Sequence, residues 1–215
     1  AGAQALVGNA TTVNPQAGGY LTLYPADAVQ PFVASSNYAT GQTMNGPFTV
    51  GLSPSGDFKI FTNKTTDLVI DIMGYYSTQV TDANGQGLLF NSLGSPLRLL
   101  DTRNIMNNNA CYQPNAPMAA QAVYTQETQI PCTNLTPTAR ALIGNVTVVA
   151  PAEAGWLTFW PSDAAQQPTT ATSNYTSGQV FNRYFTVGLG PDAAFKRYSR
   201  RTTEVVIDIS GFFAP

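Results

Sequence analysis

The side chains best suited to acid–base chemistry here are carboxylates, because the 215 residues include no histidine. Asp71 and Asp208 interrupt apolar segments at matched places in the chain. Such a carboxylate could act as a general base beside a second one, as in glycoside hydrolysis. An aspartate within a strand more commonly accepts backbone hydrogen bonds or pairs with a cation, and Lys59 and Lys196 are matched candidates. We interpret both aspartates as structural and keep a Ca²⁺ site as a weak alternative.

Several catalytic classes are excluded by composition alone. Without histidine, Ser-His-Asp, Cys-His and HExxH sites are impossible. Two cysteines cannot complete a zinc site by themselves, and no phosphate-binding glycine loop is present. We therefore predict that the chain is not an enzyme and that it binds no cofactor or metal.

Cys111 and Cys132, separated by 20 residues, are the only thiols. A disulfide between them is the leading interpretation, and two free buried thiols are the alternative. The bond would stabilise an Asn- and Pro-rich loop by roughly 3 kcal/mol. It would also indicate an oxidising compartment, so we predict an extracellular or cell-surface location.

The charge and the hydropathy of the chain argue against two classes of partner, nucleic acids and the membrane interior. Only 10% of residues are charged and the net charge is −2, which argues against a nucleic-acid groove. The apolar runs are far shorter than the roughly 20 residues that span a bilayer, so we expect no membrane insertion. The printed sequence begins at Ala1, which we interpret as a processed N-terminus after signal-peptide removal, or as a fragment.

The sequence repeats itself, and this is its strongest signal. The offset grows by one residue after an insertion near Gln167, and about half of the positions in the matched blocks are identical. The matched blocks are residues 5–15 with 141–151, 19–25 with 155–161, 36–38 with 173–175, 48–52 with 185–189, and 68–74 with 205–211.

Within each copy, apolar residues alternate with polar ones at a period of two, and Pro and Gly punctuate the segments. This pattern predicts an all-β fold made of two tandem copies of a β-sandwich-like unit, jelly-roll or immunoglobulin-like. We expect the first copy to span residues 1–79. Residues 80–215 hold the second copy, preceded by a leader with the cysteine loop that the first copy lacks.

The leader contains Pro96-Leu-Arg-Leu-Leu-Asp-Thr-Arg103. Together with NVTVVAP, GWLTFWP, SNYTSGQ and VVIDISGFF downstream, it resembles a domain found, often in tandem, in secreted and surface proteins of bacteria. The first copy carries a looser version from Leu6 to Tyr76, with departures at Ala10 and Thr12. The resemblance implies export and a surface role, and it implies no catalytic residues. Within the motif we expect Leu99 and Leu100 to be buried, and Asp101 and Arg103 to fix the register of the leader through hydrogen bonds.

Aromatic residues recur at matched positions: Tyr20 and Tyr24 in the first copy, Trp156 and Trp160 in the second. They could form core, a subunit interface or a sugar-stacking face, and all three interpretations stay open. Asn63, Asn134 and Asn174 lie in glycosylation patterns and are possible acceptors.

These observations predict a non-enzymatic extracellular structural protein, a subunit of a filament, sheath or layer that self-associates through β-strand contacts. The reason is the leader: if it gives the second copy a strand, the first copy has an open sheet edge. The alternative is a monomeric glycan-binding or adhesive surface module. An additional possibility is that the segment 88–103 contributes to both copies within one chain, which would make the chain a self-contained monomer.

Overall fold

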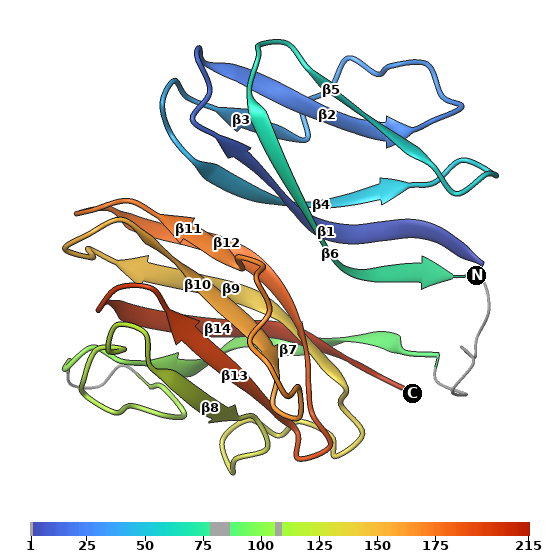
Figure 1. Ribbon diagram of the computed structural model, residues 1–215. Coiled ribbons are helices and arrows are strands. Elements are labelled where there is room, and N and C mark those ends of the chain that lie inside the picture. Colours follow the sequence, from blue (N-terminus) through green and yellow to red (C-terminus); the bar gives the residue numbers. More distant parts are fainter. Residues whose placement is uncertain (1, 78–86, 106–108) are drawn as a thin grey trace. The chain divides into compact units, whose positions relative to one another are not determined.

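The computed structural model describes residues 2–77, 87–105 and 109–215, and it is all-β (Figure 1). The chain divides into two compact units, Ala1–Asp82 and Ala83–Pro215, called here the first and the second unit. Among the described residues there is no helix, and hence none that could cross a membrane. The predicted fold class is confirmed: four antiparallel sheets form two pairs.

The first unit pairs two three-stranded sheets. One has the order β4-β1-β6, and the other has the order β3-β2-β5. The strands are β1 (Ala3–Val13), β2 (Gly19–Pro25), β3 (Ser36–Tyr38), β4 (Met44–Gly51), β5 (Phe58–Thr62) and β6 (Asp67–Ser77).

The second unit pairs two four-stranded sheets, with the orders β12-β9-β14-β7 and β11-β10-β13-β8. Its strands are β7 (Leu89–Asp101), β8 (Val123–Glu127), β9 (Ala141–Val149), β10 (Gly155–Pro161), β11 (Ser173–Tyr175), β12 (Val180–Gly188), β13 (Ala194–Ser199) and β14 (Glu204–Ala214).

The sequence repeat is a structural repeat, because β1 to β6 correspond in order to β9 to β14 and pair in the same way. The registers agree as well: Asn9 lies opposite Asp71, and Asn145 opposite Asp208. β7 and β8, which come from the leader, have no counterpart among the described strands of the first unit.

A matched glycine lets the central strands approach closely. A Cβ added at Gly8 would collide with the carbonyl oxygen of Asp71, and one at Gly144 with that of Asp208. Each glycine lies next to a register shift in its strand pairing. The two units therefore share a backbone irregularity that only glycine fits.

Each unit has its own core between its two sheets. In the first unit the buried cluster is small: Ala10, Leu21, Leu23, Tyr38, Phe48 and Val50. The cluster of the second unit contains the matched residues and also residues of the leader, namely Leu99, Leu100, Met118, Leu135 and Ala139. The leader thus completes the core of the second unit.

Candidate functional site

Strand β7 inserts the two leucines of the leader motif into the second unit. Leu99 and Leu100 are fully buried. β7 pairs antiparallel with β14, with Leu100 opposite Ile207 and Arg98 opposite Asp208. Leu99 is the extra residue between these two pairs, so it forms a bulge that sends both leucines into the core.

Asp101 and Arg103 bond to each other at the end of β7. Arg103 donates from Nε to Oδ1 at 2.9 Å and from Nη2 to Oδ2 at 2.7 Å, a bidentate pair. The Arg103 amide adds a third bond to Oδ1 at 3.1 Å. Burial alone would raise the pKa of Asp101, but the hydrogen bonds and charge of Arg103, with the charge of Arg98, lower it overall. The carboxylate is therefore held charged inside the fold.

The cation that pairs with Asp208 is Arg98 and not Lys196. Arg98 Nε donates to Asp208 Oδ1 at 2.9 Å, and Arg98 Nη1 lies 3.6 Å from Asp101 Oδ2. Lys196 instead donates from Nζ to the Ala164 carbonyl at 3.1 Å. The expected lysine partner was wrong because the bulge at Leu99 sets Arg98 directly opposite Asp208.

The outer edge of β7 is covered by the cysteine loop. Cys111 N donates to Arg98 O at 2.9 Å, Tyr112 N to Leu99 O at 3.0 Å, and Asp101 N to Tyr112 O at 3.1 Å. The predicted disulfide is present: Cys111 is bonded to Cys132, which follows β8. The disulfide therefore links the edge of the sheet that contains β7 to the segment that follows β8 of the other sheet. It closes this side of the sandwich.

Strand β8 covers the edge of the second sheet in the same unit. It pairs with β13, where Arg197 lies opposite Tyr124. The Arg197 guanidinium sits over the Tyr124 ring, 4.7 Å from its centroid. Burial lowers the pKa of Arg197 to about 10. This arginine is thus enclosed by β8.

The corresponding edges in the first unit have no added strand: within residues 2–77, 87–105 and 109–215, nothing pairs with the outer edge of β6 or of β5 as a strand. Val69 is 48% exposed, whereas its counterpart Val206 is 3% exposed. Ile72 is 48% exposed, whereas Ile209 is fully buried. Residues of similar type in matched strands differ because the neighbouring strand is present in one unit only.

The interior of the first unit is open on this same side. Phe58 and Ile60 on β5, and Leu68 and Ile70 on β6, are only partly buried and pack at the border of the core. We call these four residues, with Ile72, the open side of the first unit. Their counterparts Phe195, Arg197, Val205, Ile207 and Ile209 are all buried.

The matched aromatic residues do not form one exposed face. Trp156 is 37% exposed and lies beside Arg200, whose guanidinium is 5.4 Å from the ring centroid. Trp160 is only 4% exposed. In the first unit Tyr20 and Tyr24 are half-buried, and the Tyr20 ring lies 6.0 Å from Phe61.

The three possible glycosylation acceptors lie in different surroundings. Asn63 is exposed, but its Oδ1 accepts the Tyr20 amide at 2.7 Å. Asn134 is exposed in the loop after the disulfide. Asn174 lies half-buried in β11, so its side chain is less accessible.

An apolar surface that sequence reasoning missed lies in the loop between β2 and β3. The side chains of Val29, Phe32 and Val33 are exposed there. The loop is anchored by Thr22 Oγ1, which donates to Val33 O at 2.6 Å. Comparison of the two copies could have revealed this surface, since the second copy has Thr169-Thr170 where the first has Phe32-Val33.

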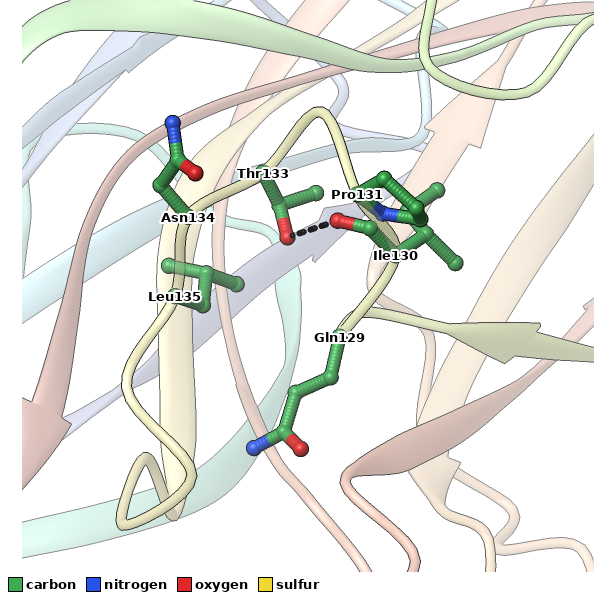
Figure 2. A pocket seen from close by; sticks show the side chains of 6 residues that line it. All are labelled: Gln129, Ile130, Pro131, Thr133, Asn134 and Leu135. Carbon is green, nitrogen blue, oxygen red and sulfur yellow. Dashed lines mark hydrogen bonds between the residues drawn. The ribbon is translucent and has the colours of Figure 1, made fainter.

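A shallow hollow lies beside the disulfide, and Figure 2 shows its lining: Gln129, Ile130, Pro131, Thr133, Asn134 and Leu135. None of these side chains is ionisable near neutral pH. The Thr133 hydroxyl lies within hydrogen-bond distance of the Ile130 and Thr128 carbonyls. Across the described part of the chain, no three His, Cys, Asp or Glu side chains group as metal ligands.

No protein-family model matches the chain, and no curated protein matches it. The resemblance drawn from the leader and repeat motifs therefore stays a prediction.

Proposed function

We propose that the chain is a non-enzymatic structural subunit of an extracellular filament, sheath or layer. One observation carries the proposal: the side that β7 and β8 close in the second unit is open in the first. Among the residues that the structure describes, the open side combines unpaired strand edges with partly exposed core residues. Such a surface is a template for strand addition by another chain.

The geometry of an open sheet edge favours the growth of an open polymer. A contact in which one subunit's edge receives a different surface of the next is heterologous, and it need not close on itself. Repeated contacts of this kind generate fibres or layers. The first unit would then be the acceptor end of each subunit, whereas the closed second unit would not accept a strand there.

Three further features support this role. The disulfide suits an oxidising compartment outside the cytoplasm. The low content of charged residues reduces repulsion between closely packed copies. The apolar loop at Phe32 offers a second contact surface in the first unit. The alternative of a glycan-binding module is weaker, because burial of Trp160 leaves no paired stacking face in the second unit.

Electron microscopy of protein purified without denaturation tests the proposal. We expect regular fibres or sheets, and a size-exclusion profile that shifts to larger species as concentration rises. Ile72→Lys should abolish assembly, because a charge on the open edge opposes strand addition. The matched control is Val180→Lys, the same apolar-to-charged change at an exposed position on β12 of the second unit, which should leave assembly intact. A monomer at every concentration for the unmodified chain would contradict the proposal.

A further inference from the structure

We infer that the open side of the first unit accepts a strand with the chemistry of β7, an apolar–Arg–Leu–Leu–Asp segment carried by another polypeptide. This inference rests on the proposed function and deepens it, because it names the partner. The chain itself shows the complex: β7 on β14 in the second unit is the template for the incoming strand on β6.

The backbone of β6 is suited to this strand. In the second unit, Thr102 N donates to Val205 O at 3.0 Å, and Val205 N donates to Thr102 Oγ1 at 2.7 Å. Val205 therefore presents its backbone groups toward the leader. Leu68 holds the matched position in β6, and β6 pairs with β1 in the same register as β14 with β9. The backbone N–H and C=O groups of Leu68, and of alternate residues after it, thus point toward the open edge.

Side chains define the specificity of the site. Leu100 lies opposite Ile207 and Leu97 opposite Ile209, whose counterparts are Ile70 and Ile72. An incoming strand in this register would place leucines over the open side and cover Ile72. The acceptor therefore selects for apolar residues at these positions.

The donor is not the β7 of the same chain. That strand is bonded to β14 on one edge and to Cys111 and Tyr112 on the other. The disulfide locks the second contact in place. A donor strand must therefore come from another polypeptide, and from a part of it that is not already engaged in a second unit.

A synthetic peptide of residues 89–103 tests the inference against the full chain. We expect saturable one-to-one binding by fluorescence anisotropy of a labelled peptide, with slower amide hydrogen exchange in β6 from Leu68 to Ile72. A control peptide with Leu99→Asp and Leu100→Asp should bind at least about tenfold more weakly, because two buried leucines become charged. Ile72→Lys in the chain should weaken binding, and Val180→Lys should not.

The outcomes separate this inference from the proposed function. Peptide binding that also blocks fibre growth supports both. Fibres that form while the peptide neither binds nor inhibits would overturn the leader-type donor and leave the structural role standing. Peptide binding without fibres at any concentration would support the acceptor site and contradict the filament. Protection in β14 instead of β6 would overturn the inference, because the peptide would then be replacing β7.

Discussion

At the residue scale, Asp101 shows how the leader motif works. Its carboxylate is fully buried and is held by three hydrogen bonds from Arg103, with Arg98 nearby. Arg98 also bonds Asp208, so one arginine links β7 to β14 through two carboxylates. Charge thus fixes the place of the leader strand, while Leu99 and Leu100 supply the apolar contact.

Asp101→Asn should destabilise the second unit by about 1.5–3 kcal/mol at pH 7, because charge-assisted hydrogen bonds are lost. The folded pKa of Asp101 lies below its ordinary value of 3.8, so its contribution is complete above that pH. The contribution is lost as pH falls through the lower folded value, since protonation then favours the unfolded state. The asparagine variant should lack this part of the acid sensitivity.

Urea unfolding followed by tryptophan fluorescence measures this effect in the second unit alone, because both tryptophans, Trp156 and Trp160, lie there. Asp57→Asn in the first unit is the control, and it should leave the fluorescence transition unchanged. An unchanged urea midpoint for Asp101→Asn at pH 7 would show that the pair contributes nothing to stability.

At the element scale, the strands that the repeat contains were predictable, and the contributions of the leader were not. Alternation of apolar and polar residues, with glycines between the segments, predicts β2, β4 and β6 and their counterparts. This is possible because the pattern of a strand lies within a few consecutive residues. The partner of Asp208 depends on a one-residue bulge, which the pattern does not encode. The alternation pattern offers no reason for Trp160 to be buried while Trp156 is exposed.

The disulfide loop is the element whose removal should matter most to the second unit. Replacing Cys111 and Cys132 together with serine should lower the free energy of unfolding by about 3 kcal/mol, because a closed loop no longer restricts the unfolded chain. The tryptophan-detected urea midpoint should fall accordingly, and the reductant-treated parent should behave like the double variant. Equal midpoints for all three would mean that the backbone bonds of Cys111 and Tyr112 suffice to hold the loop.

At the scale of the whole molecule, duplication has produced two units with different degrees of closure. The second unit has four-stranded sheets, a leader in its core and a disulfide across its side. The first has three-stranded sheets and partly exposed core residues at the matched side. This difference between two matched units, one closed and one open, is the basis of the proposed assembly.

Hydrogen–deuterium exchange of assembled and dispersed protein tests this view most directly, because it reports the amides of β5 and β6 separately from those of β13 and β14. We predict that assembly slows exchange in Leu68–Ile72 and Phe58–Thr62 and leaves the matched strands of the second unit unchanged. Equal exchange of β5 and β6 in the two states would contradict the central claim that subunits join through the open side of the first unit.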